Sequence, residues 1–173
     1  MLEWLGRVDG DRCLEVGPGG GVLLERLLAG GAASVAGLDH SPDMLDLCRQ
    51  RNAQAVADGR LELKLGDAET IPWPNETFSV AVSANVFFFF DRPQAVLAEL
   101  HRVLECPGRL VTVTSPGPLP PPSLRNWWVA VWGRALHVYS DEEMAAMLVA
   151  AGFQDVSVES RDGRQLAAGA KRS

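Results

Sequence analysis

The chain alternates short apolar runs with longer amphipathic ones, and this alternation limits the folds that it can adopt. Residues 12–16 are mostly apolar and precede a run of glycines, which is typical of a buried strand. Residues 22–28 carry leucines at helical spacing and stop at Gly30 and Gly31, as an amphipathic helix does. Strands that alternate with helices form right-handed βαβ units. We therefore predict an α/β fold, with a parallel sheet that is covered by helices on both faces.

The following segments continue this pattern. Strands are predicted over residues 34–38, 61–65, 78–84 and 109–114, and helices over residues 42–57 and 93–104. Ser41 and Pro42 mark one helix start, because Ser caps a first turn well and Pro fits the first helical position.

The C-terminal part predicts one more helix and a hairpin. Ser140 and Glu143 have the spacing of a capping box, and the helix that they open is expected to end at Gly152. Residues 156–159 and 165–170 are separated by a short polar turn, so we predict that they pair as antiparallel strands.

Length and composition place the chain among ordinary globular proteins. Its 173 residues are 47% hydrophobic and 22% charged, which suits a single domain over residues 1–173. The formal net charge of −6 argues against nucleic acid as a partner, since phosphate binding gains from positive charge. The first residues lack the features of a signal peptide, and no apolar run reaches membrane-spanning length. We expect a cytoplasmic monomer or homodimer with no membrane partner.

The cysteines give no sign of a disulfide framework or a metal site. Cys13, Cys48 and Cys106 are odd in number and widely spaced. Each lies in or beside an apolar stretch, so we expect small, buried side chains in a reducing compartment. We expect no bound metal.

Residues 115–139 differ from the rest of the chain, because they begin with a proline-rich stretch and are rich in aromatic side chains. We predict that they form a lid inserted on the substrate side of the domain. Their aromatic residues are Trp127, Trp128, Trp132 and Tyr139. These rings would either cover an apolar acceptor or pack the lid onto the sheet. His137 is a candidate general base, or simply a surface histidine.

Three of the predicted strands end in residues that suit one ligand. The first runs into the glycine-rich residues 17–21, where the backbone can approach a ligand closely and the next helix offers unpaired N–H groups. The second ends at Asp39, whose carboxylate could accept both hydroxyl hydrogens of a ribose. The third ends at Asp67 and Ala68, which could accept from an adenine amine and donate to a ring nitrogen.

Each of these features has a plain structural explanation when it is taken alone. A glycine loop can be a tight turn, and an Asp after a strand can be a turn residue. The carboxyl ends of parallel strands meet at one edge of a sheet, however, and ligands bind there. Three such features at consecutive strand ends therefore favour one nucleoside-binding site.

These residues resemble the class I S-adenosylmethionine-dependent methyltransferase family, in its small-molecule, methyltransferase type 11-like branch. The family's first motif, an acid followed by glycines, is similar to residues 15–21. The other matching segments are residues 37–45, 66–69, 101–110 and 139–153. The resemblance implies a Rossmann-like, mostly parallel sheet of seven strands in the order 3-2-1-4-5-7-6, with the last strand antiparallel.

The resemblance also implies S-adenosylmethionine as the cofactor and a place for its amino-acid part. Gly17, Pro18, Gly19 and Gly21 would surround the methionine moiety. Glu15 would hold the ammonium group, directly or through water.

The nucleoside part has its own implied residues. Asp39 would bind the ribose, with His40 and Met44 packed near the adenine. Asp67 and Ala68 would contact the adenine edge.

Ser83 and Asn85, at the end of the strand over residues 78–84, would line the methionine side and face the acceptor. The cofactor carries an activated methyl group, so the protein needs to align the acceptor and exclude water. The implied function is methyl transfer to a small-molecule acceptor, and no catalytic residue is assigned.

Two other functions suit parts of the pattern. A nicotinamide-dependent oxidoreductase also uses a glycine loop and an acid like Asp39, although Val22 stands where the third glycine of G-x-G-x-x-G belongs. A non-catalytic cofactor-binding or scaffold protein could keep the same fold. The chain differs from the resembled family at Ser79, residues 87–90 and Arg109, where Asp, His and Gly respectively are frequent.

Overall fold

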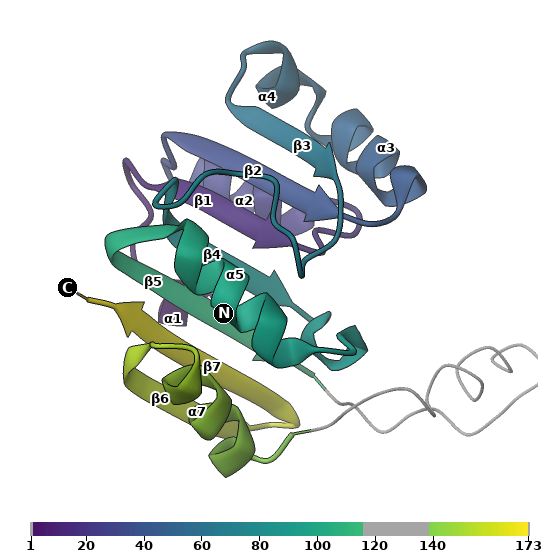
Figure 1. Cartoon of the computed structure of the whole chain (residues 1–173). Helices are drawn as coiled ribbons and strands as arrows, with labels where there is room; N and C mark the ends of the chain where they lie inside the picture. The colour runs from purple at the N-terminus through teal and green to yellow at the C-terminus, as the bar shows by residue number, and fades with distance from the viewer. Residues whose placement is uncertain (1, 116–138, 173) are drawn as a thin grey trace, which may run out of the picture.

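A computed structural model describes residues 2–115 and 139–172 of the chain. Seven strands form one sheet in the order β3-β2-β1-β4-β5-β7-β6 (Figure 1). Their bounds are β1 Arg12–Val16, β2 Ser34–Asp39, β3 Leu61–Leu65, β4 Phe78–Ala84, β5 Leu104–Thr114, β6 Gln154–Arg161 and β7 Arg164–Lys171. β7 runs antiparallel to β5 and β6, and the other neighbouring pairs are parallel. The strand order implied by the resemblance is confirmed.

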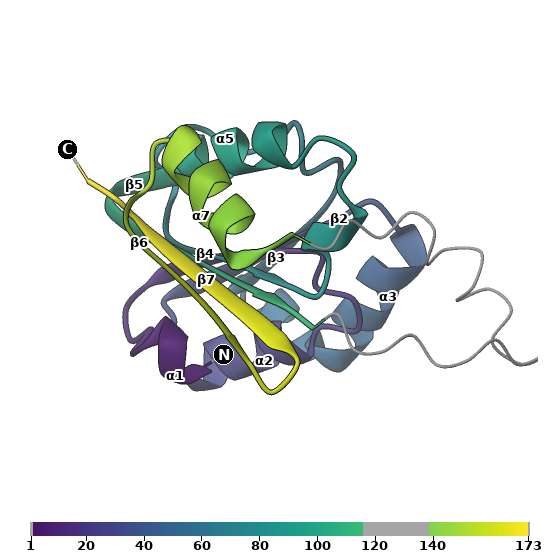
Figure 2. The same cartoon turned by 90° about the horizontal axis from the view of Figure 1, so that it is seen from below.

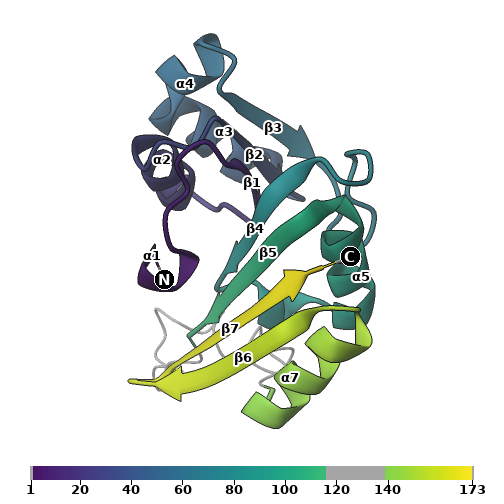
Figure 3. The same cartoon turned by 90° about the vertical axis from the view of Figure 1, so that its left-hand side faces the viewer.

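Helices cover both faces of this sheet, as predicted, and Figure 2 shows the two layers. One face carries α1 Leu2–Leu5, α2 Val22–Ala29, α3 Pro42–Arg51 and α4 Ala53–Ala57. The other face carries α5 Pro93–Val103 and α7 Asp141–Ala150. Each layer buries its own apolar cluster, with Leu24 and Leu27 of α2 on one side and Leu97 and Leu100 of α5 on the other. The twist of the sheet, with β3 and β6 at its edges, is clearest in Figure 3.

The predicted helix starts are confirmed in detail. The Ser41 hydroxyl accepts a hydrogen bond from the Met44 N–H at 3.4 Å, and Pro42 occupies the first turn of α3. At α7, Ser140 and Glu143 form the complete capping box, each side chain bonding the other's backbone N–H. These local signals are reliable because both partners lie within one turn of each other.

Three expectations need correction, and one short helix was not predicted. The helix predicted over residues 42–57 breaks at Asn52 into α3 and α4, because the Asn52 backbone leaves helical geometry at φ −112° and ψ 31°. β5 begins at Leu104 rather than at residue 109, with a register shift against β4. The short helix α1 had no sequence signal. Cys106 is exposed, whereas Cys13 and Cys48 are buried and all three are free thiols.

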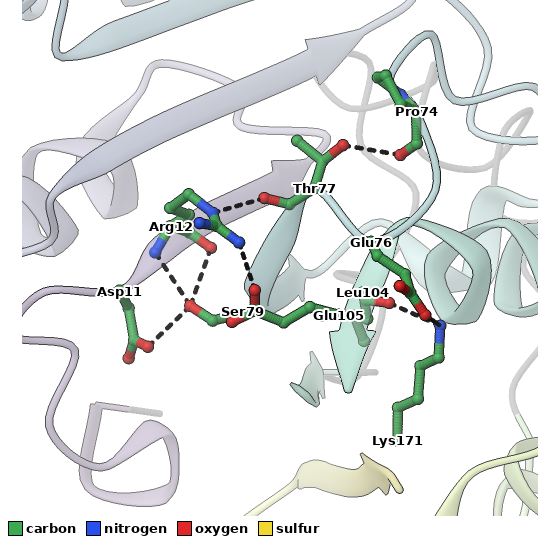
Figure 4. Close-up of polar contacts among 9 residues, drawn as sticks. All are labelled: Asp11, Arg12, Pro74, Glu76, Thr77, Ser79, Leu104, Glu105 and Lys171. Atoms are coloured by element: carbon green, nitrogen blue, oxygen red, sulfur yellow. Dashed lines mark hydrogen bonds and ion pairs between the residues drawn. The ribbon is translucent and has the colours of Figure 1, made fainter. Parts of the chain in front are cut away.

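The departures at Ser79 and Arg109 are explained by one polar network at the amino-terminal ends of β1 and β4. The Ser79 hydroxyl donates to Asp11 Oδ1 at 2.8 Å, and Arg109 Nη2 contacts Asp11 Oδ2 at 2.6 Å. Arg12 donates its backbone N–H to Ser79 and its Nε to the Thr77 carbonyl at 2.8 Å (Figure 4). This network holds strands together at the end of the sheet opposite the predicted site. Residues 116–138 of the predicted lid, with Trp127, Trp128, Trp132 and His137, lie outside the described residues.

Candidate cofactor site

A cavity of about 610 Å³ opens at the carboxyl ends of β1, β2 and β3. Its lining combines all three strand ends that the sequence singled out with the turn after β4. The lining residues are Val16, Gly17, Gly19, Leu38, Asp39, His40, Ser41, Met44, Gly66, Asp67, Ala68, Glu69, Val86, Phe89, Phe90 and Asp91. The prediction that the glycine loop, Asp39 and Asp67 meet in one place is therefore confirmed.

The glycine loop brings bare backbone to the cavity wall. Gly17 has φ +71°, and a Cβ placed there would lie 2.5 Å from Val86 Cγ1. Its N–H donates to the Leu38 carbonyl at 2.8 Å, which ties the loop to β2. Gly17 is therefore required both by its left-handed backbone and by the closeness of Val86.

Asp39 is nearly buried at the end of β2, with a residue exposure of 7%. Its Oδ1 accepts a hydrogen bond from the Ser41 N–H at 2.9 Å and lies 3.6 Å from His40 Nδ1. The His40 side chain itself is largely exposed. The backbone bond from Ser41 fixes the orientation of the carboxylate, which leaves acceptor capacity for a ligand at the cavity wall.

Asp67 lies directly across the cavity edge, after β3. Its Oδ1 accepts from the Glu69 N–H at 2.9 Å, an Asx turn that sets the side-chain direction. The loop that follows is held from α5: Arg102 Nη2 donates to the Ile71 carbonyl at 2.8 Å, and Arg102 Nη1 donates to the Trp73 carbonyl at 2.9 Å. Glu99 accepts from the Ile71 N–H at 2.8 Å.

Glu15 is a buried acid beneath this site, on β1, and it is 2% exposed. Burial and, to a smaller extent, the nearby Asp39 charge raise its pKa to about 8, although a hydrogen bond from the Leu24 backbone opposes the shift. Its Oε2 has no hydrogen-bond partner among the residues that the structure describes. A buried carboxyl with an unused oxygen, next to a second acid, favours a cationic ligand group. S-adenosylmethionine carries such groups, so the residues present fit it.

Five predicted residues do not line the cavity. Three of them, Glu15, Pro18 and Gly21, belong to β1 and the glycine loop.

The other two belong to the end of β4. Ser83 is fully buried, and its Oγ lacks a hydrogen-bond partner within the described part of the chain. Asn85 has φ +58°, and its Oδ1 accepts from the Ser115 N–H at 2.8 Å. Asn85 therefore ties the end of β4 to the end of β5. The cofactor-binding role assigned to each of the twelve residues stays a prediction.

The phenylalanine run divides into two roles, and its cavity side was not assigned from sequence. Phe87 is buried in the apolar core, where it packs edge-on against Phe90 at 5.6 Å and Tyr139 at 6.0 Å. Phe89 is 52% exposed at the cavity rim, and Phe90 also lines the cavity. Four consecutive aromatic side chains on a tight turn do not all enter the core, and here two of them line the cavity.

Two further properties apply to residues 2–115 and 139–172. No group of three or more His, Cys, Asp or Glu side chains is placed there to hold a metal ion. No helix there has the length and apolar character needed to cross a membrane.

The comparison with known families matches the part of the chain that holds the cavity. Residues 14–112 match a family described as "Methyltransferase domain", and every cavity-lining residue lies within that range. A 2-methyl-6-phytyl-1,4-hydroquinone methyltransferase of Oryza sativa subsp. japonica is 32% identical over 70% of this chain and 34% of its own length. A phthiotriol/phenolphthiotriol dimycocerosates methyltransferase of Mycobacterium leprae is 34% identical over 90% of this chain and 55% of its own length.

The chain thus spans between a third and about half of these two relatives. Among solved structures, an S-adenosylmethionine-dependent methyltransferase from Mesorhizobium loti superposes with a TM-score of 0.80 at 18% identity, covering 98% of this chain and 94% of that one. This structural likeness shows the fold. The family match favours a methyltransferase over the alternative of a nicotinamide-dependent oxidoreductase. The chain belongs to the S-adenosylmethionine-dependent methyltransferase family, and S-adenosylmethionine is its cofactor.

Proposed function

We propose that this chain transfers a methyl group from S-adenosylmethionine to a small, largely apolar acceptor molecule. One observation carries the proposal: the bare backbone at Gly17 and Gly19 and the two carboxylates Asp39 and Asp67 line a single cavity. This combination provides separate contacts for an amino-acid part, a ribose and an adenine.

Each end of the cavity has a distinct task in this proposal. Asp39, fixed by the Ser41 N–H, accepts from the ribose hydroxyls. Asp67 and the Ala68 N–H contact the adenine edge, and His40 and Met44 pack beside the nucleoside. Pro18 and Gly21 shape the loop.

The methionine end has its own residues. Glu15 holds the ammonium group, and Ser83 and Asn85 support the wall that faces the acceptor. When bound, the sulfonium supplies an activated methyl group. The protein's own residues then orient the acceptor and exclude water, which is where catalysis in such a site arises.

The acceptor's character is proposed from the turn after β4. Phe89 presents an exposed ring at the cavity rim, and Phe90 adds a second aromatic wall beside it. Such rings favour an apolar or aromatic partner over a strongly polar one. The names of the two relatives, a phytyl hydroquinone methyltransferase and a dimycocerosate methyltransferase, agree with an apolar acceptor.

Calorimetric titration with S-adenosylmethionine, its demethylated product S-adenosylhomocysteine and NAD tests the cofactor part of the proposal. The first two should bind and NAD should not. Asp39→Ala should weaken binding by about 1–3 kcal/mol, because buried ribose hydroxyls lose their acceptor. The matched control is Asp46→Ala, which removes the same charge from an exposed position on α3. Equal affinity in wild type and Asp39→Ala would contradict the ribose role.

A methyl-transfer assay tests turnover and separates an enzyme from a non-catalytic cofactor-binding protein. Radiolabelled donor is offered with a panel of prenylated hydroquinones, long-chain phenols and, for contrast, small polar amines. We expect transfer to the apolar members. Cofactor binding without transfer to any member of a broad metabolite panel would favour the scaffold alternative.

We further propose that the protein works as a cytoplasmic monomer or homodimer, without nucleic acid as a partner. The net charge of −6 supports the last point. Light scattering of the purified protein checks the oligomeric state.

A further inference from the structure

Helix α3 donates hydrogen bonds to three successive carbonyls of the glycine loop. Cys48 Sγ donates to the Gly19 carbonyl at 3.0 Å, and Arg51 Nε donates to the Gly20 carbonyl at 2.7 Å. Asn52 Nδ2 completes the row at the Gly21 carbonyl, at 3.2 Å. The three donors come from one helix face, and their acceptors are three consecutive peptide groups about 30 positions earlier in the chain.

This arrangement fixes the direction of the loop's N–H groups. In a trans peptide, the carbonyl of one residue and the N–H of the next point in opposite directions. Holding the Gly19 carbonyl against Cys48 therefore turns the Gly20 N–H away from α3. Among the described residues, the N–H groups of Gly19 and Gly20 have no hydrogen-bond acceptor, and Gly19 lines the cavity.

The contact between helix and loop is also close. A Cβ at Gly21 would lie 2.8 Å from Asn52 Nδ2 and 3.1 Å from Cys48 Sγ. The absence of a side chain at Gly21 thus lets α3 approach, as well as letting the loop turn at φ +76°. Cys48 can serve as a donor because burial raises the pKa of its thiol to about 11, which keeps it protonated at neutral pH.

We propose that Cys48, Arg51 and Asn52 are positioning residues that hold the glycine loop in the form that binds the amino-acid end of the cofactor. The inference rests on the proposed function. It assigns these residues an effect on one part of the ligand only, because the nucleoside contacts Asp39 and Asp67 lie outside the loop.

Arg51 offers the cleanest test, because its side chain is 46% exposed and is not part of the core. Arg51→Met keeps the aliphatic stem and removes the donor. Arg49→Met is a matched control, since Arg49 is on the same helix, is equally exposed at 46% and pairs only with Asp46 on the surface. Glu25→Gln controls for the ion pair of Arg51 with Glu25, at 3.6 Å.

Two ligands separate positioning from general loss of structure. S-adenosylhomocysteine carries the amino-acid part, whereas 5′-methylthioadenosine has the same nucleoside and lacks it. Arg51→Met should weaken S-adenosylhomocysteine binding about tenfold relative to Arg49→Met, and change methylthioadenosine binding less than about twofold. Arg51→Lys, which restores a donor, should recover most of the loss.

Other results would overturn the inference. Equal weakening of both ligands would show that Arg51 only maintains the fold, and no weakening beyond that of Arg49→Met would show that it is irrelevant. The same test can be made at the Gly19 carbonyl. Cys48→Ala removes the donor there, whereas Cys48→Ser keeps one. If wild type itself fails to bind S-adenosylhomocysteine, the proposed function fails; if wild type binds it and the variants bind it equally well, only the positioning role fails.

Discussion

Glu15 and Asp39 bring two acids to one corner of the sheet, on neighbouring strands. Burial raises the Glu15 pKa to about 8, so the folded protein holds a proton there that the unfolded chain releases near its ordinary value of 4.5. The contribution of Glu15 to the free energy of unfolding is therefore fully present below about pH 4.5, and it decreases as the pH rises from there to about 8. A bound cation beside Glu15 would offset this loss by favouring the charged carboxylate.

Glu15→Gln should therefore separate stability from binding. At pH 8.5 and without ligand, the variant should be more stable than wild type by about 4–5 kcal/mol, because it has no charge to bury. At pH 4 the two should be nearly equal, since wild-type Glu15 is then largely protonated in both the folded and the unfolded state. Urea unfolding at both pH values measures the difference, and titration with S-adenosylmethionine should show weaker binding by the variant. A pH-independent difference in stability would contradict the assignment of the raised pKa to Glu15.

The residues of the site could be predicted where a simple rule of the fold places them. Asp39 and Asp67 follow strands, and parallel strands end at one edge, so their meeting could be predicted from order alone. The place of Phe89 at the cavity could not be predicted in this way. Its exposure depends on how Phe87 packs in the core against Tyr139, which is more than 50 positions away. The same holds for the burial of Glu15, whose neighbours include the Leu24 backbone of α2 and Asp39 of β2.

At the scale of elements, local signals predicted nearly every helix and strand, and long-range contacts explain the errors. Residues 42–57 have unbroken helical character, yet the helix ends at Asn52, whose side chain bonds the carbonyl of Gly21. β5 begins before the predicted residue 109 because Phe78 pairs with Leu104, a long-range contact that no local sequence pattern indicates.

The loop after β3 is a second example of long-range control, and it yields a prediction. Arg102 bonds two backbone carbonyls of this loop and the Asn75 side chain, and its hydrogen bond to Glu99 holds the Glu99 pKa below its ordinary value. Arg102→Met should lower the free energy of unfolding by about 2 kcal/mol and weaken S-adenosylmethionine binding, because Asp67 belongs to the released loop. Urea unfolding and calorimetry measure the two effects.

Arg161→Met is the control for the loss of a positive charge in Arg102→Met, because Arg161 lies at an exposed position on β6. The Glu99 contribution to stability should be present above about pH 4.5 and decline as the pH falls through the lowered pKa, since the carboxylate must be ionised to bond Arg102. Unchanged stability in Arg102→Met would show that the loop is held by its apolar contacts alone.

For the whole molecule, the cavity joins segments from the ends of four strands, so ligand binding should stabilise the fold as a unit. A ligand at 100 times its dissociation constant adds about 2.7 kcal/mol to the free energy of unfolding. For a chain of this size, that corresponds to a rise in Tm of roughly 5–10 °C. Differential scanning fluorimetry with S-adenosylhomocysteine should show this shift, and NAD at the same concentration should leave Tm unchanged. A chain that binds the nucleoside without any rise in Tm would contradict a site formed in the native state only.

The place of β7 between β5 and β6 has a consequence for biosynthesis. β6 leaves the ribosome before β7. Among the described strands, β6 pairs only with β7, and β5 pairs with the same strand along its outer edge. A nascent chain that has emerged only as far as β6 therefore displays an open sheet edge that includes Val111 and Val113, and such edges recruit other chains. We expect this to be the stage of synthesis at which the protein depends most on chaperones.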